Sequence, residues 1–143
     1  SVTCKHNIVS GLLQPNKNII ELLKRYEDSV LFTEDGNEYY PNISLKEIKN
    51  NEEYICNLFN CNLFLCEGQT SFLADAFYNG KFSVVMINHN DTECIINGII
   101  SEQFGYSKSI YDYTEDISQY MSNNIDVHYN DKINFLHERI DAL

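Results

Sequence analysis

Three short polar segments follow apolar stretches and contain the side chains best suited to chemistry, residues 10–16, 66–71 and 88–93. The second segment is the most informative. Gly68 permits a close backbone approach, and Gln69, Thr70 and Ser71 offer amide and hydroxyl groups where an apolar helical pattern begins. The start of a helix carries partial positive charge, so this segment favours a phosphate ligand. The alternative is that Thr70 or Ser71 only caps the helix.

Three acids and a histidine complete the set of candidate site residues. Asp75 lies one turn further along the same expected helix, where its carboxylate could accept both hydroxyls of a ribose. The alternative for Asp75 is a solvated acid on a helix surface. His89 titrates near neutral pH and could act as an acid or a base. Asp91 and Glu93 open the next expected helix, where acids stabilise the helix dipole without any further function.

The five cysteines do not have the spacing of a metal site. Cys56, Cys61 and Cys66 are each separated by four residues, whereas zinc knuckles pair cysteines two residues apart. We therefore expect no bound metal and no other cofactor. Cys56 and Cys66 are interpreted as small buried residues in a reduced compartment.

The apolar periodicity places the polar segments at the ends of strands. Strands are expected over residues 6–10, 29–33, 43–48, 62–66, 82–87 and 107–110. Helices are expected over residues 16–26, 52–59, 71–78, 91–104, 114–121 and 132–143. At residues 43–48, Ser44 and Glu47 also form a helix capping box, which leaves a helix start open there. This alternation predicts an α/β fold, a Rossmann-like parallel sheet with helices on both faces. Ligands of such sheets bind outside the carboxyl ends of the strands, where the three polar segments lie.

Length and charge exclude several classes of function. The 143 residues, 43% of them hydrophobic, suffice for one domain, which we expect to span residues 1–143. The 21 acidic against 10 basic side chains oppose binding to nucleic acid or to an anionic membrane surface. No apolar run approaches the ~20 residues of a membrane span, so a cytoplasmic location is expected. The first residue is Ser1 rather than Met, which suggests a domain excised from a larger two-domain protein.

The spacing of small and acidic residues resembles the C-terminal half of GT-B fold nucleotide-sugar enzymes. The similar enzymes are the UDP-N-acetylglucosamine transferase of lipid II synthesis, its dolichol-pathway cousin and the nucleotide-sugar hydrolase of pseudaminic acid synthesis. The residues that carry the resemblance are Gly68, Asp75, Gly80, Asp91, Asn97 and Gly105. It covers residues 5–113 and favours the strand at residues 43–48. The family usually has Glu at the position of Asp75, and Gln just after the loop Asp, where this chain has Glu93 and Cys94.

The resemblance implies a donor-binding domain of a glycosyltransferase or sugar-nucleotide hydrolase in bacterial surface-glycan synthesis. Asp75 would hold the ribose, residues 68–71 the diphosphate, and Gly11 would allow close approach to the sugar phosphate. His89, Asp91 and Glu93 would complete the site of a nucleotide sugar, most simply a UDP-linked one.

The resemblance also implies that the acceptor and the catalytic base belong to an N-terminal GT-B domain or a partner subunit. No catalytic residue is therefore assigned, and this chain alone is expected to be inactive. The alternatives are one half of a UDP-sugar 2-epimerase, suggested by the pair Gly80-Lys81, and a non-catalytic α/β scaffold or signalling module.

Overall fold

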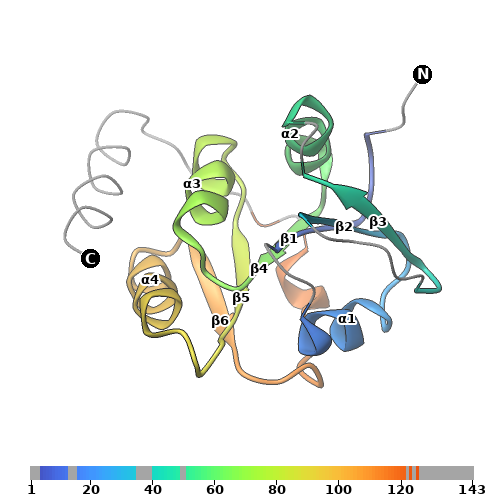
Figure 1. Ribbon diagram of the computed structural model, residues 1–143. Coiled ribbons are helices and arrows are strands. Elements are labelled where there is room, and N and C mark those ends of the chain that lie inside the picture. The colour runs from blue at the N-terminus through green and yellow to red at the C-terminus, as the bar shows by residue number, and fades with distance from the viewer. Residues whose placement is uncertain are drawn as a thin grey trace.

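The computed structural model describes residues 4–12, 16–34, 40–48, 51–121, 123 and 125. The described chain forms one parallel sheet with helices on both faces (Figure 1). The strands are β1 (Ile8–Leu12), β2 (Ser29–Thr33), β3 (Ile43–Glu47), β4 (Leu63–Cys66), β5 (Ser83–Met86) and β6 (Ser107–Ile110). The helices are α1 (Lys17–Leu23), α2 (Asn51–Asn60), α3 (Thr70–Tyr78), α4 (Thr92–Gln103) and the 3₁₀ turn η1 (Ser118–Tyr120). In these ranges no helix has the length and apolar character that crossing a membrane requires.

The strand order creates a switch point in the middle of the sheet. The six strands are arranged β3-β2-β1-β4-β5-β6, and every neighbouring pair is parallel. The chain moves outward from β1 to β3, then crosses back and moves outward again from β4 to β6. Connections from β1 and β4 therefore leave in opposite directions, which opens a crevice at the carboxyl ends of these two strands. This order confirms the predicted Rossmann-like α/β class.

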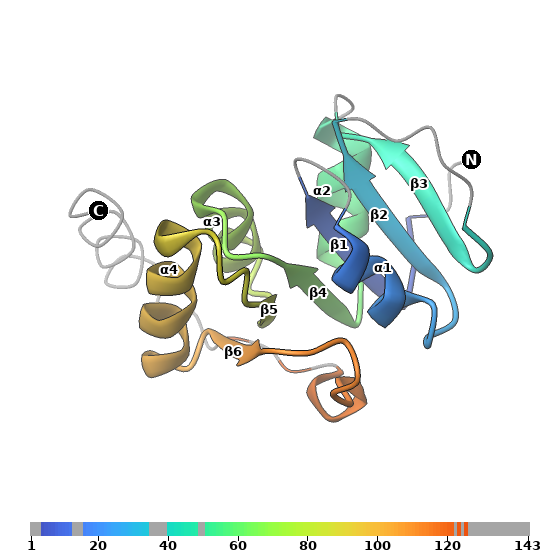
Figure 2. The same ribbon diagram turned by 60° about the horizontal axis from the view of Figure 1, so that its bottom comes forward.

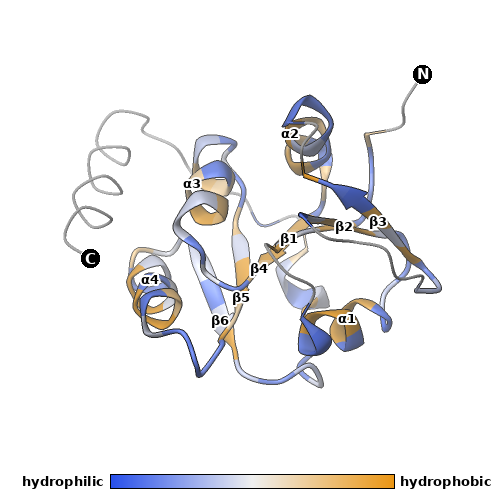
Figure 3. Ribbon diagram, in the orientation of Figure 1, coloured by the Kyte–Doolittle hydropathy of each residue, from blue (hydrophilic) through white to orange (hydrophobic). Residues whose placement is uncertain are grey.

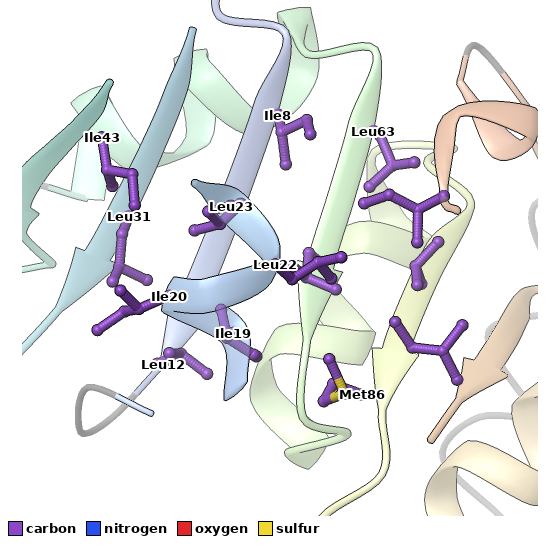
Figure 4. Packing of buried hydrophobic residues seen from close by; sticks show 14 residues of the cluster. Ile8, Leu12, Ile19, Ile20, Leu22, Leu23, Leu31, Ile43, Leu63 and Met86 are labelled. Carbon is purple, nitrogen blue, oxygen red and sulfur yellow. The ribbon is translucent and has the colours of Figure 1, made fainter. Parts of the chain in front are cut away.

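Side chains that alternate along the strands build a separate core on each face. Ile8, Leu31 and Leu63 point to the face covered by α1, where Ile117 also packs (Figure 4). Val9 and Phe64 point to the opposite face, covered by α2 and α3. The orange colour of the central strands in Figure 3 shows this two-sided apolar character. Burial on both faces explains the nearly continuous apolar runs of the strands.

Most elements fall where the sequence predicts them, and the segment at residues 43–48 forms the strand that the resemblance implied, as β3 over Ile43–Glu47. One difference is that β1 continues through Gly11 to Leu12, where a break was expected. Gly11 pairs with Phe32 of β2, and its missing side chain leaves room for the Phe72 ring of α3. The loop glycine of the sequence prediction is therefore a glycine inside a strand.

The helix predicted over residues 114–121 is wrong except for the short turn η1. Acidic side chains in this segment bind backbone N–H groups nearby: Glu115 accepts from Tyr111 and Asp112, and Asp112 accepts from Thr114. Such local bonds compete with the helical ladder. The helix predicted over residues 132–143 lies outside the described residues.

The cysteines differ in part from the prediction. Cys56 is joined to Cys4 by a disulfide that ties the N-terminal segment to α2, so it is not the buried free thiol that was expected. A count of cysteines could not reveal this pair, because two residues far apart in sequence are brought together only by the fold. Cys61, Cys66 and Cys94 are buried free thiols. Among the described residues, no three His, Cys, Asp or Glu side chains are grouped so that they could hold a metal ion.

We predict that Gly11→Ala destabilises the fold. A Cβ at this position would lie 2.7 Å from two ring atoms of Phe72, which is itself only 2% exposed. Overpacking of this kind costs roughly 1–3 kcal/mol, more than the roughly 0.4–1 kcal/mol gained when Ala restricts the unfolded chain. Urea denaturation should show a lower free energy of unfolding for Gly11→Ala than for the wild type. Phe72→Leu should cost less in the Gly11→Ala background than in the wild type, and equal costs would contradict the clash.

Candidate functional site

The candidate site lies at the carboxyl ends of β1, β4 and β5, where three loops meet beside the switch point. The described residues there are Asn16, residues 67–69 and residues 87–91. Helices α1 and α2 lie on opposite sides of β1 in both views of the ribbon (Figures 1 and 2). The loops after the central strands therefore emerge between the two layers of helices.

The loop after β4 is fastened to α4. Gly68 has a φ of +96°, a conformation that favours glycine, and an added Cβ would stand 2.7 Å from the backbone carbonyl of Cys94. The side-chain amide of Asn97 donates to the Gly68 carbonyl at 3.0 Å and to the Thr70 hydroxyl at 3.2 Å. The close contact with α4 thus explains why a glycine stands at position 68, whether or not a ligand binds there.

The first turn of α3 is not capped by a side chain. Helix α3 begins at Thr70 with Gln69 in the N-cap position, and Gln69 makes no capping hydrogen bond. The alternative that Thr70 or Ser71 caps this helix is therefore wrong. The Thr70 hydroxyl donates instead to Glu93 at 3.3 Å, Ser71 is exposed, and the Gln69 side-chain oxygen is buried without a hydrogen-bond partner. The N–H groups of this turn remain suited to an anion.

Asp75 is half-buried on α3 and faces α2. The Tyr54 hydroxyl is buried and has no partner at full hydrogen-bonding geometry, yet it lies close enough to the Asp75 carboxyl to lower its pKa. Burial has the larger effect and raises the pKa of Asp75 above its ordinary value. The alternative of a fully solvated surface acid does not describe this residue.

The loop after β5 holds the remaining predicted residues. Asp91 is the N-cap of α4, and its carboxylate accepts the N–H of Cys94 at 3.1 Å. His89 is exposed in a turn that is closed when the Asn88 side chain accepts the N–H of Asn90 at 3.0 Å. Glu93 is exposed in the first turn of α4. Asp91 therefore has a structural function independent of any ligand, whereas His89 is accessible and has no positioned partner among the described residues.

The sequence analysis missed Glu67, which directly follows β4. It is 6% exposed, and within the described part of the chain its Oε2 atom has no hydrogen-bond partner. Burial raises the pKa of Glu67, while the side-chain amides of Asn16 and Asn88 lower it by less, and the nearby charge of Asp91 raises it further. Asn16 is the N-cap of α1, so residues from the ends of three neighbouring strands surround this carboxyl. The only sequence signal was an acid directly after a buried strand.

The local charge decides which ligand groups each part of this edge accepts. Residues 66–71 and 87–93 contain Glu67, Asp91 and Glu93 but no Lys or Arg. The uncapped N–H groups of α3 are chemically suited to an anion, and carboxylates are suited to hydrogen bonds from hydroxyl or amine groups.

Comparison with solved structures identifies proteins with a similar fold. No protein-family model matches the sequence, and no curated protein matches it. The glycosyltransferase SnogD from Streptomyces nogalater is similar, with a TM-score of 0.60 and 14% identity over 99% of this chain and 39% of its own. MurG from Acinetobacter baumannii is also similar, with a TM-score of 0.52 and 13% identity over 95% of this chain and 42% of its own. The spinosyn rhamnosyltransferase SpnG, complexed with thymidine diphosphate, has a TM-score of 0.52 and 12% identity over 94% of this chain and 38% of its own.

The described chain therefore has the Rossmann-like fold of one half of a GT-B glycosyltransferase. It spans less than half the length of each of these solved structures.

We predict that Asn97→Ala loosens the loop after β4. The substitution removes two hydrogen bonds and leaves the buried Gly68 carbonyl without the Asn97 amide, a change that costs roughly 1–3 kcal/mol. The matched control is Asn60→Ala, because the Asn60 amide also donates to a backbone carbonyl but is exposed. Denaturant unfolding should separate the two variants. Equal losses would show that the Asn97 bonds do not hold the loop.

We predict that Glu67→Gln stabilises the protein at neutral pH. The pKa of Glu67 is higher in the folded protein than its ordinary value of 4.5. Glu67 therefore contributes favourably to the free energy of unfolding below pH 4.5, and this contribution is lost as the pH rises through the folded-state pKa. At pH 7 the buried carboxylate lowers the stability of the fold. Its replacement by a neutral amide should therefore raise the free energy of unfolding by about 1 kcal/mol, the order of the desolvation penalty of one buried group. Thermal unfolding should show this gain at pH 7 and none near pH 4. A gain that persists at low pH would contradict this.

Proposed function

We propose that this chain is the donor-binding half of a GT-B glycosyltransferase or sugar-nucleotide hydrolase, and that its ligand is a nucleotide sugar. The observation that carries the proposal is the uncapped first turn of α3 beside the switch point of a six-stranded parallel sheet. The likeness to glycosyltransferase halves supports it. Bacterial surface-glycan synthesis in the cytoplasm is the proposed setting, taken from the sequence resemblance described above.

In this proposal the diphosphate binds at the N-terminus of α3. The N–H groups of Thr70 and Ser71 point along the helix axis toward the ligand, and the helix dipole favours the negative charge. The Asn97 bonds keep the preceding loop in place, so the site needs little rearrangement on binding. The Glu93 carboxylate contacts Thr70 and opposes the ligand charge, which limits affinity.

The nucleoside binds further along α3 in the same proposal, where Asp75 accepts both hydroxyls of the ribose. A uridine diphosphate ligand is proposed from the resemblance, and the thymidine diphosphate bound to SpnG supports a nucleoside diphosphate more generally. Gly11 has no direct part, because the Phe72 ring occupies the space beside it.

The acceptor and the catalytic base are assigned to a second half, in the same polypeptide or in a partner subunit. His89, the exposed histidine of this edge, has no positioned partner among the described residues that would make it a catalytic base. The chain by itself should therefore bind donor without turning it over.

The pair Gly80-Lys81 gives no support to the epimerase alternative. The Lys81 ammonium donates to the Cys61 carbonyl at 2.8 Å, ahead of β5 and thus at the opposite edge of the sheet. The alternative of a non-catalytic module with the same fold would be supported if the protein binds no nucleotide.

We predict that Asp75→Ala weakens nucleotide binding about 10- to 150-fold, which corresponds to roughly 1.5–3 kcal/mol for hydrogen bonds to a charged group. Calorimetric titration of UDP and TDP into both proteins measures the change. 2′-Deoxy-UDP should bind the wild type more weakly than UDP, and the Asp75→Ala variant should not distinguish the two ligands.

Two controls accompany this experiment. Glu21→Ala removes an acid from α1 on the opposite face and should leave binding unchanged. Tyr54→Phe removes the hydroxyl beside Asp75 and tests whether that hydroxyl orients the carboxylate. Equal binding of UDP and 2′-deoxy-UDP by the wild type would exclude the role of Asp75. Absence of nucleotide binding at millimolar concentration would exclude the proposed function as a whole.

A further inference from the structure

The Cys4–Cys56 disulfide lies beside a surface hollow along α2. The hollow has a volume of about 460 Å³ and is lined by one side of α2 together with Asn79, the residue that ends α3. Cys56 is one of the lining residues, and both cysteines of the disulfide are only half-buried. A small molecule in this hollow, which we call the Cys56 hollow, can therefore reach the disulfide.

The other three cysteines are protected from exchange with an external thiol. Cys61, Cys66 and Cys94 are buried free thiols. Burial raises the pKa of Cys61 to about 11 and the pKa of Cys66 and Cys94 to about 12, so their reactive thiolate forms are scarce at neutral pH. Because exchange needs access as well as a thiolate, an external thiol acts selectively on Cys4 and Cys56.

The lining of the Cys56 hollow favours a positively charged ligand. Glu52 lies one turn before Cys56 on α2 and lines the hollow, whereas the described lining residues include no Lys or Arg. Phe59 also lines it and is 60% exposed, so its ring is accessible to a cation. An ammonium group is attracted by both side chains, and a carboxylate is repelled by Glu52.

We propose that Cys56 is a site of reversible modification by small cationic thiols that bind in the Cys56 hollow. The thiolate of the small molecule attacks the Sγ atom of Cys56, and a new S–S bond forms there. The bond to Cys4 breaks, and Cys4 leaves with the electron pair as a thiolate. Cys4 then takes up a proton from water, which replaces the proton that the small thiol released. The products are a mixed disulfide on Cys56 and a free thiol on Cys4.

The exchange removes the covalent tie between the N-terminal segment and α2 but leaves the sheet intact. His6 Nδ1 and Asp28 Oδ1 are 2.7 Å apart, and the Asn7 N–H donates to the same carboxylate at 3.2 Å. These bonds hold the chain at the start of β1, so only Cys4 and Lys5 among the described residues are released. The inference is independent of the proposed function, because none of the described lining residues belongs to the loops after β1, β4 and β5.

The experiment compares cysteamine, 2-mercaptoethanol and mercaptoacetate, which are cationic, neutral and anionic thiols. Each is added to the oxidised protein at low ionic strength, and peptide mass spectrometry measures the rate at which each cysteine gains an adduct. The intrinsic reactivity of a thiol is the same toward every variant, so changes in the cysteamine-to-mercaptoacetate rate ratio report on the protein. Glu52→Gln should lower this ratio about five-fold, as expected for unit charges about 4 Å apart in water. Salt at about 1 M should remove most of the difference.

Two further variants separate the charge of Glu52 from general effects. Glu21→Gln, the matched control, removes an acid of α1 on the opposite face of the sheet and should leave the ratio unchanged. Phe59→Leu keeps an apolar side chain without the aromatic ring, so it should slow cysteamine and leave 2-mercaptoethanol unaffected. Thermal unfolding verifies that the compared proteins are folded.

The outcomes decide the inference without any nucleotide. A first adduct on Cys56 with a free thiol on Cys4, and a ratio that Glu52→Gln lowers, would support it. A first adduct on any other cysteine, or a ratio that Glu52→Gln leaves unchanged, would overturn it. Free thiols at both Cys4 and Cys56 in protein purified in air would also overturn it. Failure of nucleotide binding would reject the proposed function and leave this result unaffected.

Discussion

The parallel pairing of β1 with β4 is the constraint on which the rest of the structure depends. Both strands are buried on both faces, so the polar groups of the chain can approach a ligand only where these strands end. Within the pair, the one buried hydroxyl of β1, Ser10, is satisfied by the Leu65 carbonyl at 2.8 Å. The interior is thereby closed to solvent, and the carboxyl edge becomes the place for chemistry.

Two features at that edge impose opposite demands on a ligand. The first turn of α3 presents N–H groups without a capping side chain, which suits negative charge. Glu67, one residue before Gly68, presents a buried carboxylate, which suits hydroxyl donors. The nucleotide sugar proposed as the ligand has an anionic diphosphate, which suits the first of these two features. The acidic character of the chain is thus consistent with an anionic ligand, because the backbone rather than lysine and arginine supplies the favourable field.

Close packing of α4 against the loop after β4 explains why several residues of the resemblance occur together. Gly68 lets the Cys94 carbonyl approach, and Asn97 bonds the loop from the next turn of the same helix. Asp91 begins that helix by accepting the Cys94 N–H. These spacings therefore encode the joint between β4 and α4 as well as any contact with a ligand. A pattern match can identify the fold from them without proving that the ligand is kept.

The sequence by itself determined the α/β class, the strand β2, the strand β6 and the polar character of the loops after β4 and β5. Apolar runs and helical periodicity depend on local geometry, which one chain segment reveals alone. Only the tertiary structure decided that Glu67 is buried, that Gly11 faces Phe72 and that Asp75 lies beside Tyr54. It also decided the Cys4–Cys56 pair and the loss of the helix at residues 114–121. Each of these depends on which distant segments meet, because burial and pairing are properties of the packed chain and not of local periodicity.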